Sequence, residues 1–308
     1  MKYKHLFGPV PSRRLGVSLG IDLVPHKTCT LNCVYCECGK TTNLTIERKE
    51  YVPTDEILNE LKHYLDESPA LDYITFSGSG EPMLHIKISE IIDFLKNNHP
   101  KYKVAVLTNG TLFYNKGVRD EVKNADLIIP SLDAGSCEIF KKINRPYEKL
   151  NLNEVVEGLA ALRKEFPGEI WLEIFVVPGL NDTVDESQKI KEIIEKINPD
   201  KIQLNTLDRP GTEKWVMPAK KEELEKIASF LNAEIIADFK PRKKIKSFSK
   251  DIEGGIISTL RRRPCTAKDL SEILGIHLNE INKYLQALIE TGKINSKEGE
   301  RGTFFRIK

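Results

Sequence analysis

The chain has 308 residues, of which 40% are hydrophobic and 30% charged, and its formal net charge is +2. These values fit a soluble globular protein. No stretch approaches the roughly 20 apolar residues that span a bilayer. The first residues carry prolines at positions 9 and 11 and do not resemble a signal peptide. We therefore expect a cytoplasmic protein with no membrane partner.

Charge is distributed unevenly. Residues 241–308 hold 15 Lys+Arg and 8 Asp+Glu, a net charge of +7, whereas residues 1–240 have a net charge of −5. A basic C-terminal part on an acidic body favours a polyanionic partner such as tRNA or DNA. The alternative is a solvated, Lys/Glu-rich surface with no such partner.

The chain opens with residues 7–16, for which the prolines predict an extended loop. In this loop Arg13 and Arg14 could meet an anion or be solvated. Strand and helix patterns then alternate, which predicts a parallel sheet wrapped by helices. The expected strands are 17–23, 73–76, 104–107, 127–129, 171–177, 201–204 and 234–236, and the expected helices are 54–65, 86–97, 118–123, 152–166, 184–197 and 221–231.

About six such βα units fall short of the eight that close a full barrel. The predicted fold class is therefore α/β, with an open, partial (β/α)6-type barrel over residues 1–240. Residues 241–250 are a polar, basic linker. Residues 251–308 carry three helix patterns and a hairpin pattern, which together predict a winged helix-turn-helix domain.

Three cysteines stand at C-x3-C-x2-C spacing after the first predicted strand: Cys29, Cys33 and Cys36. Three thiolates held this close can bind three irons of a 4Fe–4S cube and leave the fourth iron for another ligand. The alternative is a structural zinc site with Cys38 as fourth ligand, although zinc sites usually pair cysteines from two separated segments.

Polar residues follow the other predicted strands where the strands end, which is where binding residues of an α/β barrel gather. Gly80 and Glu81 follow the second strand and Asn109 the third, and Ser131 and Asp133 follow the fourth. Glycine lets the backbone approach a ligand closely, and a carboxylate suits an ammonium. Further residues of this kind, expected to face a substrate, are Gln203, Asn205, Asp208 and Arg209.

The cysteine spacing and the Ser77-Gly78-Ser79-Gly80-Glu81-Pro82 stretch resemble the signatures of the radical S-adenosylmethionine (SAM) superfamily. The resemblance implies that Cys29, Cys33 and Cys36 ligate a 4Fe–4S cluster whose open iron chelates SAM. One electron, from a donor such as ferredoxin or flavodoxin, then splits SAM to a radical that attacks a substrate. It also implies that Glu81 grips the SAM amino group beside Gly80, and that Asn109, Ser131 and Asp133 line the SAM pocket. No catalytic residue beyond these is identified.

The opening Phe7-Gly8-Pro9-Val10-Pro11-Ser12-Arg13-Arg14-Leu15-Gly16 stretch, followed by this cysteine loop, resembles a radical SAM subfamily grouped with the tRNA wyosine-base synthases. This grouping suggests an RNA substrate. In the C-terminal part, the residues expected to touch a nucleic acid are Asn279, Asn282, Lys283 and Arg301. Two alternatives stay open: a redox-sensing transcription regulator that binds DNA through the winged helix, and an activase that places a glycyl radical on a partner protein.

Overall fold

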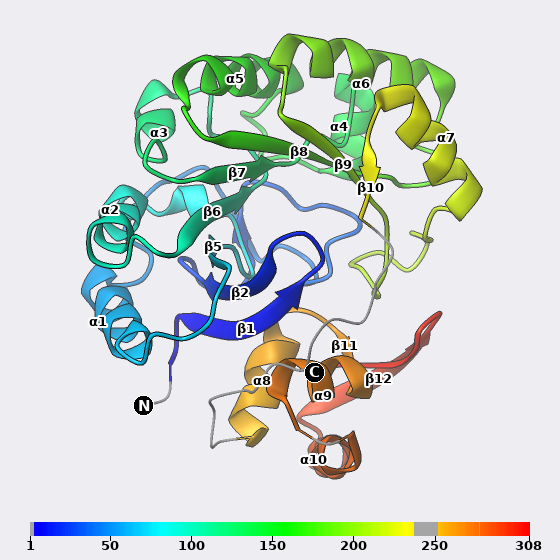
Figure 1. Ribbon diagram of the computed structural model, residues 1–308. Coiled ribbons are helices and arrows are strands. Elements are labelled where there is room, and N and C mark those ends of the chain that lie inside the picture. Colours follow the sequence, from blue (N-terminus) through cyan, green and yellow to red (C-terminus); the bar gives the residue numbers. More distant parts are fainter. Residues whose placement is uncertain (1–2, 237–251, 277) are drawn as a thin grey trace.

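An eight-stranded sheet forms the centre of the computed structural model, which describes residues 3–236, 252–276 and 278–308 (Figure 1). Its strand order is β1-β2-β5-β6-β7-β8-β9-β10, and neighbours from β2 to β10 run parallel. The parallel strands are β2 (Gly16–Ile21), β5 (Tyr73–Phe76), β6 (Lys103–Thr108), β7 (Leu127–Pro130), β8 (Glu169–Phe175), β9 (Lys201–Asn205) and β10 (Glu234–Ile235). The predicted α/β alternation is confirmed.

The prediction of a loop over residues 7–16 was wrong, because these residues contribute strand β1 (Leu6–Ser12). This strand runs antiparallel to β2, with Leu6 opposite Ile21, and the register shifts between Phe7 and Val10. It lies at the edge of the sheet. Proline has no backbone N–H to donate, so it is tolerated on an edge strand, where one side of the backbone has no partner strand.

Helices α1 to α7 cover the outside of the curved sheet (Figure 1). The buried face of α1 contains Ile57, Leu61 and Leu65, at the spacing that the sequence predicted. Asn151 and Thr183 cap α5 and α6 by accepting backbone hydrogen bonds. The helices are α1 (Thr54–Leu65), α2 (Ile88–Asn98), α3 (Lys116–Asp120), α4 (Cys137–Ile143), α5 (Leu152–Glu165), α6 (Val184–Ile197) and α7 (Lys221–Leu231).

Residues 252–276 and 278–308 form a smaller assembly, which we call the C-terminal unit. It has its own hydrophobic core, which includes Ile256, Leu270 and Leu285. The predicted linker 241–250 lies outside the described residues. The elements of the unit are α8 (Ile252–Arg262), β11 (Cys265–Thr266), α9 (Ala267–Leu274), α10 (Leu278–Glu290), β12 (Ile294–Gly299) and β13 (Gly302–Ile307), and its sheet order is β11-β13-β12.

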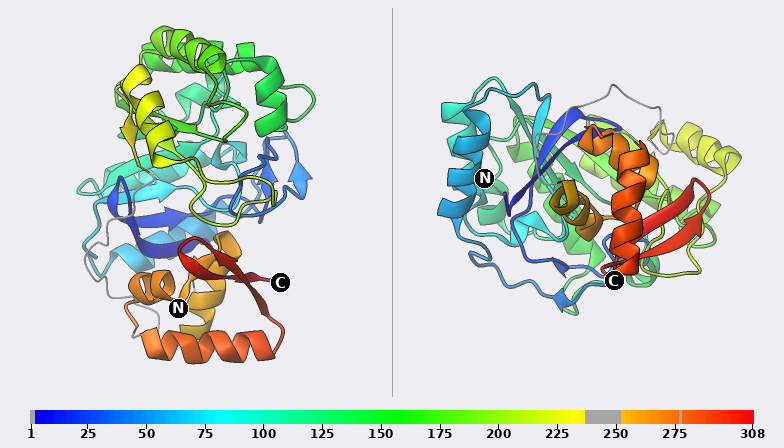
Figure 2. Two further views of the ribbon diagram at one scale, coloured as in Figure 1. Left: turned by 90° about the vertical axis from the view of Figure 1, so that its right-hand side faces the viewer. Right: turned by 90° about the horizontal axis from the view of Figure 1, so that it is seen from below.

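The C-terminal unit packs against the N-terminal edge of the large sheet. Helices α8 and α9 contact β1, and Figure 2 shows the unit beside this strand in two further views. The edge strand that the sequence analysis missed is therefore the surface on which the C-terminal unit rests. Across the described parts of the chain, every helix is too short or too polar to span a membrane.

Candidate functional site

The three cysteines lie on the loop after β2, and each sulfur faces a nitrogen donor. The loop includes β3 (Thr28–Cys29), which pairs with β4 (Asn43–Leu44). The donor pairs are Lys27 Nζ to Cys36 Sγ at 3.0 Å, Asn109 Nδ2 to Cys29 Sγ at 3.5 Å, and Asn144 Nδ2 to Cys33 Sγ at 3.5 Å. Such donors stabilise negative charge on sulfur, which is the form that binds iron.

The three thiols are partly buried and differ in acidity. Burial and the nearby Glu81 carboxylate raise the pKa of Cys29 to about 12, and burial with Asp133 raises the pKa of Cys33 well above its usual value. A hydrogen bond from Cys38 and the Lys27 ammonium lower the pKa of Cys36, against the effect of burial. A cationic ligand beside Cys29 and Cys33 would favour their thiolate forms.

This donor set fits a cluster better than a single metal ion. Among the described residues, no three His, Cys, Asp or Glu side chains converge as one metal ion requires. A 4Fe–4S cube binds each cysteine through a different iron, so it needs no such convergence. The Cys38 thiol lies beside Cys36, and the carbonyl oxygens of Gly78, at 3.8 Å, and Arg262 are also within its hydrogen-bonding distance.

Gly80 and Glu81 lie directly against the cysteine loop. A Cβ on Gly80 would stand 2.1 Å from the Thr28 carbonyl oxygen, so only glycine fits this approach. Glu81 follows at the start of the short 3-10 helix η1 (Pro82–Leu84) and is 2% exposed. Its Oε1 accepts hydrogen bonds from Thr108 Oγ1 (2.6 Å) and Met83 N (3.0 Å), and its Oε2 accepts one from Asn109 N (2.8 Å). Burial raises the pKa of Glu81 to about 6.

Asn109, Ser131 and Asp133 lie close together. With Asn144 they line a cavity of about 10 Å³ beside the cysteine loop. Asn109 Nδ2 also donates to Thr30 Oγ1 at 2.7 Å, which fixes the amide against the loop. The ends of strands β6 and β7 thus place their polar residues next to Cys29 and Cys33.

Asp133 connects three segments of the site. Its Oδ2 accepts hydrogen bonds from the Tyr35 hydroxyl and from Asn144 Nδ2 (2.6 Å), and its Oδ1 accepts one from Phe175 N (2.8 Å). Burial raises the pKa of Asp133 to about 6, although these donors oppose the shift. The Tyr35 ring stacks on Phe175 with centroids 3.8 Å apart. The cysteine loop is therefore tied to the end of β8.

A larger cavity of about 400 Å³ extends from Cys36 toward the C-terminal unit. Arg14 and Glu173 form an ion pair in its wall. Burial raises the pKa of Glu173, but Arg14 and Asn205 outweigh it and lower the pKa overall. Arg14 Nη1 also donates to Gln203 Oε1 at 3.4 Å. The anion that Arg14 meets is therefore a carboxylate of the protein itself.

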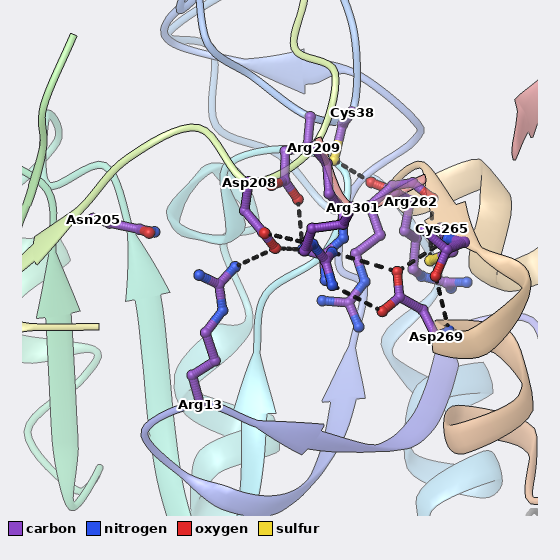
Figure 3. Close-up of polar contacts among 12 residues, drawn as sticks. Arg13, Cys38, Asn205, Asp208, Arg209, Arg262, Cys265, Asp269 and Arg301 are labelled. Carbon is purple, nitrogen blue, oxygen red and sulfur yellow. Dashed lines mark hydrogen bonds and ion pairs between the residues drawn. The ribbon is translucent and has the colours of Figure 1, made fainter. Parts of the chain in front are cut away.

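Arg209 lines this cavity, and its neighbour Asp208 lies beside it among residues of the C-terminal unit (Figure 3). Asp208 pairs with Arg13 at 3.3 Å and with Arg301 at 2.7 Å, and Arg209 pairs with Glu37 at 3.2 Å. Arg301 was expected to face a nucleic acid. It is bound within the protein instead, whereas Asn279, Asn282 and Lys283 are exposed on α10 as expected.

Three residues that contact the site, Lys27, Asn144 and Glu173, were not predicted from the sequence. Lys27 stands two residues before Cys29, a signal that was available in the sequence. Asn144 follows α4, a helix that was not predicted, and Glu173 lies within a strand, where its inward direction depends on the register. Neither position carries a motif, so only the fold shows their contacts with the site.

Comparisons with known proteins agree with this geometry. The Radical SAM superfamily model matches residues 23–196. A UPF0026 protein of Methanocaldococcus jannaschii is 33% identical over 97% of this chain and 94% of its own length. A Brachyspira hyodysenteriae protein named GTPase Obg is 38% identical over 96% of this chain, but the chain spans only 44% of that protein's length.

Solved structures show a similar fold. A radical SAM methyltransferase from Sphaerobacter thermophilus superimposes with a TM-score of 0.55 at 15% identity, covering 77% of this chain and 68% of that chain. SuiB from Streptococcus suis, bound to S-adenosylmethionine, gives 0.54 at 10% identity, covering 71% and 50%. None of these matches supports the alternative of a redox-sensing regulator. The match over residues 23–196 shows that the chain belongs to the radical SAM superfamily, whose members bind a 4Fe–4S cluster and SAM, and that it is a radical SAM enzyme.

Proposed function

We propose that Cys29, Cys33 and Cys36 hold a 4Fe–4S cluster and that SAM binds beside it. The observation that carries this proposal is the presence of one nitrogen donor on each of the three sulfurs. These donors come from three separate parts of the chain, and bonds of this kind stabilise the thiolate ligands of a cluster. Simple burial of unrelated thiols would not require such donors.

The SAM-binding residues in this proposal are Gly80, Glu81, Asn109, Ser131 and Asp133. Glu81 Oε2 accepts one hydrogen bond from Asn109 N, so a lone pair is left for the SAM ammonium. Asn109 and Asp133 then act mainly by positioning, because each bridges the cysteine loop to a strand end. Gly80 keeps the turn close enough to the loop for the backbone to approach SAM.

The cluster that Cys29, Cys33 and Cys36 would hold would supply one-electron reduction of SAM, and with it radical chemistry on the substrate. The chain's own residues orient the two partners and exclude water. The stacked Tyr35 and Phe175 rings form an apolar part of the cavity wall. We expect a one-electron donor such as ferredoxin or flavodoxin to supply the reductant.

The C-terminal unit has the helices and the hairpin that a winged helix-turn-helix requires, and we interpret it as that fold. Its placement at residues 251–308, the barrel boundary at 240 and a cytoplasmic location remain predictions. An RNA substrate and the grouping with wyosine-base synthases are also predictions. The RNA substrate is supported by the positive charge of residues 241–308 and by the exposed Asn282 and Lys283.

The test uses protein purified without oxygen and reconstituted with iron and sulfide. We expect dithionite and SAM to produce 5′-deoxyadenosine, and the Cys33→Ala variant to lose both the cluster absorbance and this product. The matched control is Cys137→Ala, because Cys137 is an exposed thiol on α4. A Cys33→Ala protein that keeps its full iron content and still cleaves SAM would refute the assignment.

A further inference from the structure

The cavity of about 400 Å³ has walls from both parts of the molecule. One wall includes Cys36 of the proposed cluster site together with Ser77 and Gly78, which precede Gly80 and Glu81 of the proposed SAM site. The opposite wall belongs to helices α8 and α9 and the turn between them, and its residues are Thr259, Arg262, Arg263, Asp269, Glu272 and Ile273. The C-terminal unit therefore builds part of the space into which a substrate must fit.

Ion pairs hold this wall in place. Arg262 pairs with Asp22 at 3.5 Å and lies over the Phe7 ring, with its guanidinium carbon 4.3 Å from the ring centroid. Arg301 Nε lies 2.7 Å from Asp208 Oδ1 (Figure 3). The enclosed volume is typical of a pocket for a small molecule.

Arg209 is a buried charge that lines this cavity. Its side chain is 4% exposed, and its Nη1 pairs with Glu37 at 3.2 Å and with Asp208 at 3.6 Å. Its Nε is buried and has no hydrogen-bond partner among the described residues. A buried donor without a partner costs free energy, so this nitrogen indicates a missing acceptor.

Arg263 adds a second guanidinium to the same cavity. No carboxylate of the described residues lies within 4.0 Å of it, whereas Arg14 and Arg262 in the same wall each have an acidic partner. Arg13 lies close to both arginines: burial lowers the pKa of Arg13, Asp208 opposes this shift, and the positive charges of Arg209 and Arg263 add to it. Two guanidiniums that line one cavity are stabilised by an anion between them.

We propose that Arg209 and Arg263 form a subsite for an anionic group, a phosphate or a carboxylate, of a small-molecule substrate, and the volume of the cavity favours such a substrate over an RNA. This inference rests on the proposed function. If the cluster and SAM lie at the end of the cavity that contains Cys36, the substrate lies at the other end, where Arg209 and Arg263 are. Arg263 lies in the turn after α8, on the side of the C-terminal unit that lines the cavity. The C-terminal unit therefore contributes directly to substrate recognition.

The test is isothermal titration calorimetry of the reconstituted full-length protein, without SAM, at constant ionic strength. Inorganic phosphate and acetate are the two probes. We expect saturable binding of at least one probe, and at least tenfold weaker binding in Arg263→Gln. Binding of phosphate alone assigns a phosphate group, and binding of acetate alone assigns a carboxylate. The matched control is Arg261→Gln, because Arg261 is exposed in the last turn of α8, two residues before Arg263, and we expect it to bind like the wild type.

Equal binding in Arg263→Gln and Arg261→Gln, or no saturable binding of either probe to the wild type, overturns the proposal. Arg263→Lys guards against a folding defect, because it keeps the charge and should recover part of the affinity. The result is separable from that of the SAM-cleavage test. Arginine-dependent anion binding in a protein that makes no 5′-deoxyadenosine would refute the proposed function and leave the anion site standing.

Discussion

At the scale of single residues, the donors on the three sulfurs differ in charge and should therefore differ in effect. Lys27 brings a full positive charge to Cys36, whereas Asn109 and Asn144 bring neutral amides. Hydrogen bonds to the sulfurs of an iron–sulfur cluster are among the features that set its reduction potential. Reduction adds negative charge, so each donor stabilises the reduced state more than the oxidised one.

We predict that Asn144→Leu lowers the reduction potential of the bound cluster by some tens of millivolts, because it removes the N–H donor to Cys33 at similar side-chain volume. A redox titration followed by electron paramagnetic resonance measures the change. Asn205→Leu is the control: Asn205 lines the same cavity but donates to Glu173, at 2.9 Å, and not to a sulfur. Equal potentials in the two variants, at equal iron content, would contradict a role for Asn144 at the cluster.

Residues next to a motif or at a predicted strand end could be expected at the site from the sequence. Asn109 and Asp133 are of this kind, because parallel strands bring their ends to one edge of the sheet. Asn144 could not be found, because it reaches Cys33 across 111 positions of sequence. Arg301 was assigned to the wrong surface for a related reason, since the position of the C-terminal unit depends on packing between elements and not on local pattern.

At the scale of elements, β1 and α9 show which signals in the sequence are sufficient to predict a strand or a helix. The helix α9 is one of the three helix patterns predicted in residues 251–308. Thr266 is a strong N-cap residue before its apolar positions, and Thr266 Oγ1 accepts a hydrogen bond from Asp269 N at 3.1 Å. Strand β1 was missed because its prolines are also typical of loops. Its strand character comes from pairing with β2, which the local sequence does not contain.

We predict that Thr266→Ala lowers the stability of the C-terminal unit by about 0.5–2 kcal/mol, because the first turn of α9 loses its side-chain cap. Hydrogen exchange of the α9 amides measures the change as faster exchange. Thr291→Ala serves as the comparison, because Thr291 lies just after α10 and its hydroxyl donates to the Ala287 carbonyl at 2.8 Å, where no N-cap is lost. Exchange in α9 that is no faster in Thr266→Ala than in Thr291→Ala would mean that tertiary packing alone holds this helix.

At the scale of the whole molecule, the opposite charges of the two parts of the chain partly meet inside the protein. Residues 241–308 carry a net charge of +7 and residues 1–240 a net charge of −5. Arg262 and Arg301 of the C-terminal unit pair with Asp22 and Asp208 of the larger part. Some of the positive charge that suggested a polyanionic partner therefore serves to dock the unit over the cavity.

Arg301 is the residue through which this docking can be tested, because it pairs with Asp208 across the interface and with Asp269 in its own unit. Networks of this kind contribute about 0.5–3 kcal/mol. We predict that Arg301→Ala speeds hydrogen exchange in β1 and α9 about tenfold, which corresponds to about 1.4 kcal/mol. Lys293→Ala is the control, because Lys293 pairs with Glu253 in an exposed ion pair within the C-terminal unit, and such pairs contribute little. If both variants exchange at the wild-type rate in β1, apolar packing and not the ion pairs keeps the cavity closed.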